Sequence, residues 1–378
     1  MKKIKYGMIG GGIGAFIGDA HRRAARLCND FELVGGVFDV DYERSLEFSR
    51  QQEIDLNRCY ETVDLLIAGE LQLPAEKRMQ LVAIVTPNTL HFPFAQKLLS
   101  NGFHVVCEKP MTITVEEAIE LEGLVNQHHL TFVLTHTYTG YPMIRQMREL
   151  IAQGQIGAVQ RVDAQYYQGW VNGIIHSTDD RISKFWKLDP SQNGISGCLG
   201  DIGVHAFNLI EYTTGQQVSE VLADLNTLKE EIKLDVDGTV LVRFESNLKG
   251  VIRASQVCAG EENNLTIGVY GSTGSLTWSQ ENPNYLTLKS ITEPIRIYKP
   301  AHIYNSEFAE GSHTMKAGHP EGYYEALANI YKGAGRSIRG EEIRPGEFPT
   351  VHDGVRGMKF IHAVVQSHRT GNKWIEIN

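Results

Sequence analysis

The first third of the chain alternates short apolar runs with longer amphipathic stretches. The apolar runs are expected to form buried strands: IKYGMIG, FELVGGVFD, LVAIVTPN, FHVVCEKP and LTFVLTHTY. The stretches between them are expected to form helices, at residues 15–28, 41–52, 91–99 and 114–128. Strands that are apolar throughout, with helices between them, are typical of a parallel sheet covered on both faces. The pattern therefore predicts an α/β fold that begins with a doubly wound parallel sheet.

The pattern of apolar and polar residues changes near residue 136. Beyond it, most expected strands alternate apolar and polar residues, as in TVLVRFE, where Val240 and Val242 face one side and Arg243 faces the other. This alternation predicts an α+β domain with a large, mostly antiparallel open sheet, one face of which meets water or another subunit. Two closing helices are expected, at residues 321–332 and 351–368. We therefore predict two domains, at residues 1–136 and 137–378.

Composition excludes several classes of protein. With 42% hydrophobic and 21% charged residues, the 378-residue chain has the composition of a soluble globular protein. The net charge of -9 disfavours a nucleic acid partner, because phosphate binding needs clustered Lys and Arg. No apolar run is long enough to cross a bilayer, and the glycine-rich, charged start makes a poor secretion signal. The five cysteines are scattered without a C-x-x-C pair, which favours a reducing cytoplasm and predicts no metal site.

A glycine-rich turn stands directly after the first strand. Residues 10–15 read GGGIGA, which fits the G-x-G-x-x-A dinucleotide fingerprint, here between a strand and a helix as that motif requires. We predict that Gly10, Gly12, Ile13 and Gly14 contact the cofactor, with the pyrophosphate at the helix N-terminus. The alternative is that the glycines only make a tight strand-to-helix crossing.

The acidic residue that ends the second strand refines the cofactor prediction. Asp39 is expected to accept hydrogen bonds from the adenosine ribose hydroxyls. Because its carboxylate would repel a 2′-phosphate, NAD is favoured over NADP, although the nearby Arg44 keeps NADP open. The alternative is that Asp39 only caps the next helix.

Two further strand ends carry polar residues. In an open parallel sheet, ligands bind outside the carboxyl ends of the strands. The expected cofactor contacts at these ends are Thr86, Pro87, Asn88 and His91 after the third strand, and Glu108 and Lys109 before Pro110 after the fourth. Asn88 could instead cap a helix, and Lys109 could be an ordinary surface lysine.

In the second half, GCLGDIGVHAF places Asp201 and His205 four positions apart at the start of an expected helix. That spacing predicts that both side chains lie on one face. A helix cap and a half-buried histidine are the simpler explanation. A carboxylate and imidazole pair can also bind metal, but no third ligand with suitable spacing is found.

Taken together, the glycine motif, EKP and GDIGVH resemble the Gfo/Idh/MocA family of oxidoreductases. The resemblance implies a nucleotide-binding Rossmann domain, followed by a sheet domain that binds sugar and forms homo-oligomers, dimers or tetramers. It implies that Lys109 is the catalytic lysine and that Asp201 and His205 are the family's D-x-x-x-H pair, all three at the substrate. Stretches such as GHPEGYYEALANIY resemble a sugar-oxidising subgroup that includes levoglucosan dehydrogenase, which implies substrate contacts at Tyr138, Gln168, Trp170 and His319.

These observations predict an NAD(P)-dependent oxidoreductase acting on a secondary alcohol of a sugar or cyclitol. Oxidation needs a hydride acceptor and a base for the hydroxyl proton, and either Lys109 or His205 is expected to be that base. An ordinary lysine amine is protonated at neutral pH, so a base role needs burial or a neighbouring positive charge. The alternative is a regulatory protein that binds cofactor and sugar without chemistry.

Overall fold

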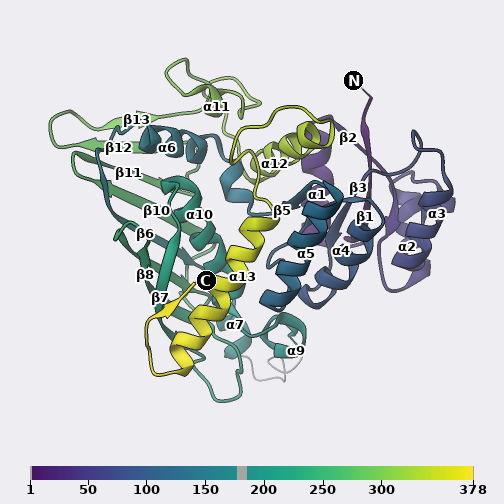
Figure 1. Cartoon of the computed structure of the whole chain (residues 1–378), viewed down its shortest axis with the longest axis horizontal. Helices are drawn as coiled ribbons and strands as arrows, with labels where there is room; N and C mark the ends of the chain where they lie inside the picture. Colours follow the sequence, from purple (N-terminus) through teal and green to yellow (C-terminus); the bar gives the residue numbers. More distant parts are fainter. Residues whose placement is uncertain (1, 177–184, 378) are drawn as a thin grey trace. The chain divides into compact units, whose positions relative to one another are not determined.

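The computed structural model describes residues 2–176 and 185–377, which form two compact units (Figure 1). The first unit comprises Met1–Thr137 and Tyr324–Val355. The second comprises Tyr138–Tyr323 and Arg356–Asn378.

A five-stranded parallel sheet forms the centre of the first unit. Its strands are β1 (Ile4–Gly10), β2 (Phe31–Val37), β3 (Leu81–Val85), β4 (His104–Cys107) and β5 (Phe132–Leu134), in the order β2-β1-β3-β4-β5. Every adjacent pair is parallel. The chain leaves β1 toward β2 and later returns to β3 on its other side, so the order reverses between β1 and β3. Ligands bind at such a reversal, outside the carboxyl ends of the strands.

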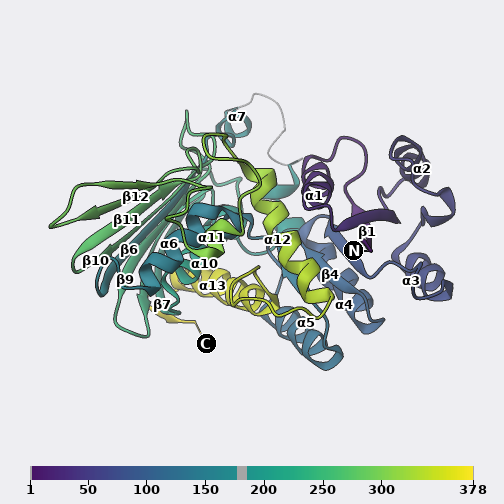
Figure 2. The same cartoon turned by 90° about the horizontal axis from the view of Figure 1, so that it is seen from above.

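Helices cover both faces of this sheet, which confirms the predicted doubly wound fold. They are α1 (Phe16–Leu27), α2 (Tyr42–Gln51), α3 (Val63–Gln72), α4 (His91–Ser100) and α5 (Val115–His128). Figure 2 shows α1 and α4 on opposite faces. Helix α5 begins at a capping box, in which Thr114 and Glu117 each bond the other's backbone N–H. Helix α3 was not predicted, because its apolar residues stand side by side in sequence and lack a helical period.

The second unit contains a nine-stranded sheet, in the order β13-β12-β11-β10-β6-β9-β8-β7-β14. All neighbours are antiparallel except β6 and β9, as predicted for a mostly antiparallel sheet. The strands are β6 (Val159–Tyr167), β7 (Val218–Asn226), β8 (Asp237–Phe244), β9 (Lys249–Ser255), β10 (Asn264–Gly271), β11 (Gly274–Ser279), β12 (Leu286–Ser290), β13 (Arg296–Tyr298) and β14 (Ile375–Glu376).

One face of the large sheet packs against helices α6 (Pro142–Ala152) and α10 (Val204–Thr214) (Figure 2). The alternate residues Leu265, Ile267 and Val269 of β10 are buried, as the period-two pattern predicts. Short helices in the described part of the chain include α7 (Asn172–Ile175), α9 (Pro190–Asn193) and α11 (Glu307–Glu310). Helix α13 (Val351–Arg369) contains the boundary between the units, after Val355.

The segment Tyr324–Val355 folds with the first unit, whereas the predicted range for the second domain was 137–378. Helix α12 (Tyr323–Ile338) brings Tyr331 within ring contact of Phe31, with centroids 5.3 Å apart. Just beyond the helix, Arg339 pairs with Asp30 at 2.7 Å. An amphipathic pattern predicts a helix with an apolar face, but it does not say which core that face will join.

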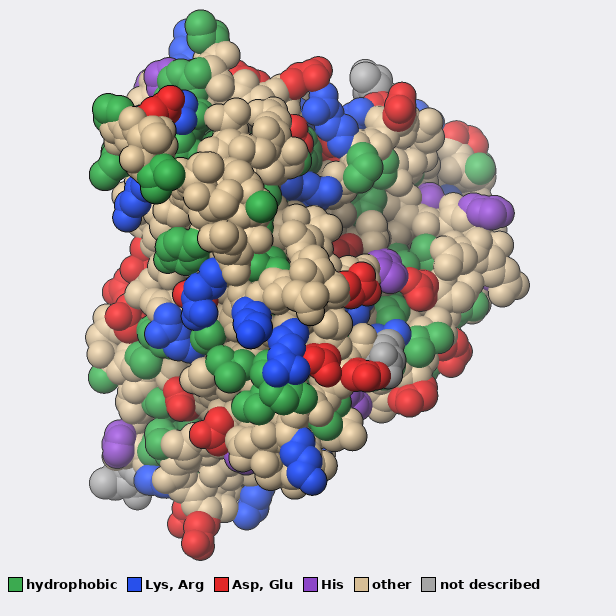
Figure 3. Space-filling model, turned by 60° about the vertical axis from the view of Figure 1, so that its left-hand side comes forward, with side chains coloured by type: hydrophobic (Ala, Val, Ile, Leu, Met, Phe, Trp, Pro, Cys, Tyr) green, Lys and Arg blue, Asp and Glu red, His purple; other side chains and the backbone are tan. Residues whose placement is uncertain are grey.

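Charged side chains of both signs are interspersed on the face drawn in Figure 3. The five cysteines are all unpaired thiols. Within residues 2–176 and 185–377, no helix is both long enough and apolar enough to cross a membrane.

Candidate active site

The glycine turn has the backbone that the fingerprint requires. Gly10 and Gly14 both have φ of 80°, a conformation that other residues adopt at a cost. A side chain at Gly14 would meet nothing within 4 Å, so the backbone there faces open space. Helix α1 has no side-chain cap at its N-terminus, which leaves its first N–H groups for an anion. The turn fits the pyrophosphate of a dinucleotide.

Close packing holds this turn in place. The Gly12 N–H donates to the Phe38 carbonyl at 3.0 Å, and a Cβ on Gly12 would lie 2.8 Å from that oxygen. A Cβ on Gly18, within α1, would lie 2.3 Å from the Cα of Gly11. The sequence analysis did not single out Gly18, although a glycine inside an expected helix is a signal of close backbone approach.

Asp39 lies just beyond β2, with a side chain that is 22% exposed. Its carboxylate accepts hydrogen bonds from the Asp41 N–H at 3.1 Å and from Arg44 Nε at 2.9 Å. The pKa of Asp39 is lowered, chiefly by the Asp41 hydrogen bond and also by Arg44, against the opposing effect of burial. An ionised acceptor therefore stands at the end of β2, where ribose hydroxyls would need it.

His91 joins the loops after β3 and β4. Its ring is fully buried, with Nδ1 2.8 Å from the Pro110 carbonyl oxygen and Nε2 3.0 Å from the Thr86 carbonyl oxygen. Burial lowers the pKa of His91, although the two carbonyls favour the protonated ring. Because both ring nitrogens are engaged by backbone, a role of His91 at the cofactor would be exerted through these two loops. Pro87 and Asn88 lie in the first of them, and Asn88 is buried.

Lys109 directly follows Glu108 at the carboxyl end of β4, and the Lys109–Pro110 peptide bond is cis. The charge of Lys109 acts on the buried His136, just after β5. The pKa of His136 falls to about 3, first because of burial and then because of Lys109, with Glu108 opposing. His136 was not predicted as a site residue, although it also stands at a strand end.

In the second unit, Asp201 lies in a π-helical turn, Leu199–Gly203, that leads into α10. Its Oδ2 accepts hydrogen bonds from Lys187 Nζ and Gln256 Nε2, each at 2.9 Å. The shared face of Asp201 and His205 stays a prediction. Lys187 and Gln256 were missed, because no sequence signal connects them with Asp201.

His205 is 8% exposed and lies against aromatic rings. Its ring centroid is 5.0 Å from that of Tyr138 and 6.3 Å from that of Tyr166. The two tyrosine hydroxyls are 2.5 Å apart. The predicted residues Tyr138 and His205 are thus brought together.

A hydrogen-bonded chain extends from this pair. Tyr166 donates to Asn263 Oδ1 at 3.1 Å, and Gln168 donates to the same oxygen at 2.7 Å. Trp170 Nε1 donates to Gln168 Oε1 at 2.8 Å. The Lys187 ammonium lies 5.6 Å from the centre of the Trp170 ring. Five predicted residues, Tyr138, Gln168, Trp170, Asp201 and His205, therefore belong to one connected cluster, which we call the polar cluster.

A pocket of about 780 Å³ adjoins this cluster, since Asn263 and Tyr323 line it and Tyr323 contacts the Tyr138 ring. His319 is exposed and lines the same pocket, with Nδ1 3.1 Å from the Lys316 carbonyl oxygen. Among the predicted substrate residues of the second unit, it is the one that lies outside the polar cluster. The pocket volume suits a small polar organic ligand.

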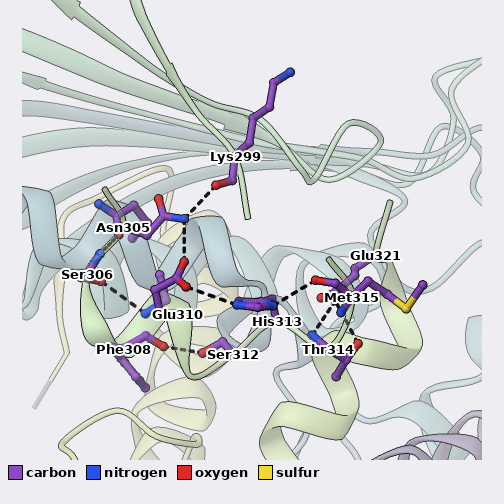
Figure 4. A network of polar contacts seen from close by, with 12 residues as sticks. Lys299, Asn305, Ser306, Phe308, Glu310, Ser312, His313, Thr314, Met315 and Glu321 are labelled. Carbon is purple, nitrogen blue, oxygen red and sulfur yellow. Dashed lines mark hydrogen bonds and ion pairs between the residues drawn. The ribbon is translucent and has the colours of Figure 1, made fainter. Parts of the chain in front are cut away.

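A hydrogen-bond network orders one wall of this pocket (Figure 4). The carboxylate of Glu321, which is 5% exposed, accepts hydrogen bonds from Thr314 and from the Met315 N–H. His313 lies 3.3 Å from a Glu310 carboxylate oxygen. These contacts connect Glu310 with His313, and Glu321 with Thr314 and Met315. The part of the chain that the structure describes contains no group of three metal-binding side chains.

Comparison with known proteins gives two matches to family models. Residues 4–147 match the model described as "Oxidoreductase family, NAD-binding Rossmann fold". Residues 144–277 match the GFO/IDH/MocA C-terminal domain.

Solved structures and curated relatives are similar to this chain over nearly its full length. An inositol dehydrogenase homolog from Azotobacter vinelandii, complexed with NAD+, is 31% identical with a TM-score of 0.93, covering 99% of this chain and 97% of its own. An oxidoreductase from Sinorhizobium meliloti is 39% identical with a TM-score of 0.89, covering 99% and 100%. The Bacillus subtilis oxidoreductase YfiI is 30% identical over 99% of this chain and 97% of its own.

These matches span both units and contain the glycine turn, the end of β4 and the Asp201–His205 segment. The fold and cofactor class that the sequence predicted are confirmed. The chain belongs to the GFO/IDH/MocA family of NAD-dependent oxidoreductases.

Proposed function

We propose that this protein oxidises a secondary alcohol of a sugar or cyclitol, or reduces the corresponding ketone. The observation that carries the proposal is the polar cluster of the second unit, which groups hydroxyl, amide, carboxylate and imidazole side chains beside a pocket. Such groups suit a ligand with many hydroxyls. The A. vinelandii homolog has been solved with NADH and myo-inositol, which supports the same class of substrate.

In the proposed reaction, the glycine turn and Asp39 would hold NAD, which when bound would supply the hydride acceptor for the carbinol carbon. The hydroxyl proton goes to Lys109, which would return it in the reducing direction. Asp201 accepts a hydrogen bond from a substrate hydroxyl, and Lys187 and Gln256 hold its carboxylate. His205 binds the substrate or shares the proton, and its packing against Tyr138 fixes its ring.

The first test is NADH absorbance at 340 nm with a panel of sugars and cyclitols that includes myo-inositol. We expect turnover with at least one polyol. Tight NAD binding without turnover of any polyol would contradict the proposal and favour the regulatory alternative.

Lys109→Ala tests the proton acceptor. We expect nearly unchanged NAD binding and a fall in kcat of about 10²–10⁴, the usual contribution of a positioned acid or base. Lys97→Ala is the matched control, since Lys97 is an exposed lysine of the same unit that pairs with Asp64. Unchanged turnover in Lys109→Ala would remove Lys109 from the mechanism.

We further propose that the protein is a cytoplasmic homo-oligomer that assembles through the large sheet. Leu222, Leu241 and Val251 are cross-strand neighbours on β7, β8 and β9. Leu241 is 41% exposed, and the other two are half-buried. Neighbouring exposed apolar residues on a sheet face favour burial against another subunit.

A further inference from the structure

Hydrogen bonds in the polar cluster run in one direction, which is set by Trp170. An indole N–H can only donate, so Gln168 accepts from Trp170 Nε1 with its side-chain oxygen, at 2.8 Å. The nitrogen of the Gln168 amide then donates to Asn263 Oδ1, at 2.7 Å. These contacts assign the oxygen of the Asn263 amide to the polar cluster and leave its nitrogen, Nδ2, on the other branch of the amide.

The tyrosines of the cluster follow the same direction. The Tyr166 hydroxyl donates to the same Asn263 oxygen at 3.1 Å, which uses its one proton. Tyr138, whose hydroxyl lies 2.5 Å from that of Tyr166, is therefore the donor in that pair. Both lone pairs of Asn263 Oδ1 are then occupied, so this side chain binds a ligand only by donating from Nδ2.

Asn263 is held in place and reaches the pocket. It directly precedes β10, and its backbone N–H donates to Glu281 Oε1 at 2.8 Å. The residue is exposed and lines the pocket of about 780 Å³. Within residues 2–176 and 185–377, its Nδ2 donates to no acceptor. Asn263 thus offers an oriented N–H donor at the boundary between the polar cluster and the pocket.

Aromatic rings also connect the pocket with the polar cluster. The Tyr138 ring, which packs against His205, has its centroid 6.4 Å from that of Tyr141 and 6.5 Å from that of Tyr323. Tyr141 and Tyr323 both line the pocket. A ligand that contacts His205 therefore lies next to the pocket.

Hydrogen bonds join the walls of the pocket to each other. Asn284, in the loop after β11, donates from Nδ2 to the Glu321 carbonyl at 2.8 Å and accepts from the Glu321 N–H at 3.3 Å. The Glu321 carboxylate in turn accepts from Thr314 and from the Met315 N–H (Figure 4). The pocket is thus formed before a ligand binds, which lowers the ordering cost of binding.

The size and lining of the pocket indicate a neutral ligand that extends beyond one ring. Its volume of about 780 Å³ lies in the range of pockets for drug-sized ligands, and a single ring at the polar cluster would leave it unfilled. Among the described residues, two lysines and three glutamates line it: Lys299, Lys316, Glu262, Glu281 and Glu321. Without an excess of positive charge, the pocket disfavours a phosphate group.

We propose that this pocket binds the second ring of a neutral disaccharide or other glycoside whose first ring is oxidised at the polar cluster, and that Asn263 Nδ2 donates to an oxygen of that second ring. The inference rests on the proposed function for the position of the first ring. Asn263 is then a specificity-determining residue, although it was not a predicted site residue. Tyr285, which lines the pocket and is 40% exposed, contributes an aromatic face to the second ring.

Isothermal titration calorimetry tests the pocket without requiring turnover. The full-length protein, saturated with NADH, is titrated with maltose, cellobiose, trehalose and sucrose, and with their constituents glucose and fructose. We expect at least one disaccharide to bind at least about tenfold more tightly than its constituents, because the second ring adds a hydrogen bond and an aromatic contact. Glucose 6-phosphate should bind no more tightly than glucose.

Asn263→Asp tests the donor. The aspartate keeps the oxygen that accepts from Gln168 and Tyr166, and it replaces the N–H groups of Nδ2 with a second acceptor. We expect the Kd of the best disaccharide to rise about tenfold, while the Kd of the monosaccharide stays within about twofold.

The control and a second variant separate this donor from general effects. Asn226→Asp is the matched control, since Asn226 is exposed, accepts from the Leu228 N–H with Oδ1 and is not among the described residues that line the pocket. We expect no change in either Kd. Tyr285→Ala should weaken binding of the disaccharide alone, and it remains informative where Asn263→Asp disturbs the polar cluster.

Disaccharides that bind no more tightly than their constituents would overturn the proposal, and so would tighter binding of glucose 6-phosphate than of every disaccharide. A disaccharide Kd that is the same in Asn263→Asp, Tyr285→Ala and the parent would also overturn it. Tight binding of a disaccharide without turnover of any sugar would contradict the proposed function and still support the pocket, so the two failures are distinguishable.

Discussion

Lys187 forms an ion pair with Asp201. Its ammonium lies 2.9 Å from Asp201 Oδ2 and is 32% exposed, so water screens the pair only in part. Gln256 donates to the same oxygen. Two side chains thus donate to the same carboxylate oxygen of Asp201.

Replacing Lys187 should weaken catalysis without affecting the cofactor. In Lys187→Met, Asp201 keeps Gln256 but loses its counter-charge, so its orientation toward substrate loosens. We expect kcat/KM for the best polyol to fall about tenfold, equivalent to about 1.4 kcal/mol. Lys187→Arg, which keeps the charge, should retain most of the activity. Equal kcat/KM in Lys187→Met and the parent would show that Asp201 needs no support from this side.

At the scale of single residues, the sequence predicted the site residues that belong to a known motif or stand at the end of a strand. Gly10, Asp39, Lys109, Asp201 and His205 are of this kind. The residues it did not find, such as Lys187, Gln256 and Asn263, come close only through folding, because their partners lie 14, 55 and 95 positions away in sequence. Separations of that kind leave no local signal.

Among the elements, the π-helical turn before α10 depends on one buried carboxylate. Asp235, 5% exposed, accepts hydrogen bonds from the Ser196 hydroxyl and the Gly197 N–H at 2.8 Å each, and from the Leu199 N–H at 2.7 Å. Burial raises the pKa of Asp235, although these donors oppose the shift. Asp235 therefore anchors the segment that carries Asp201.

Asp235→Asn should destabilise the protein and disturb Asp201. One of the two side-chain acceptors becomes an NH₂ group that faces a backbone N–H, which leaves buried donors unsatisfied. We expect the free energy of unfolding in urea to fall by about 1–3 kcal/mol, together with a loss of kcat. Asp224→Asn is the control, because Asp224 is 79% exposed, and we expect a change within about 0.5 kcal/mol. Similar losses in both variants would contradict the anchoring role.

Element positions were predicted well where periodicity is strong, as in α1 and α5. Helix α3 and the π turn were not, since one lacks a clear apolar stripe and the other depends on Asp235, a residue from a distant loop. Local pattern predicts an element, whereas its exact geometry is decided by tertiary contacts.

For the whole molecule, the proposed assembly through the large sheet can be tested with one substitution. Leu241→Asp places a charge in the centre of the apolar row formed with Leu222 and Val251. A buried unpaired charge is costly, so we expect the oligomer to dissociate, with a lower molar mass in size-exclusion chromatography with light scattering. Leu65→Asp is the control, since Leu65 is an exposed leucine of α3 in the other unit. An unchanged mass in Leu241→Asp would place the assembly on another surface.

The return of Tyr324–Val355 to the first unit matters for how the protein is made. When the first 137 residues leave the ribosome, the ring of Tyr331 that packs against Tyr6 and Phe31 has not yet been translated. Part of the core of the nucleotide-binding unit therefore stays exposed to water until nearly the entire chain has emerged. Although it comes first in the gene, this half can be completed only after most of the second has been synthesised.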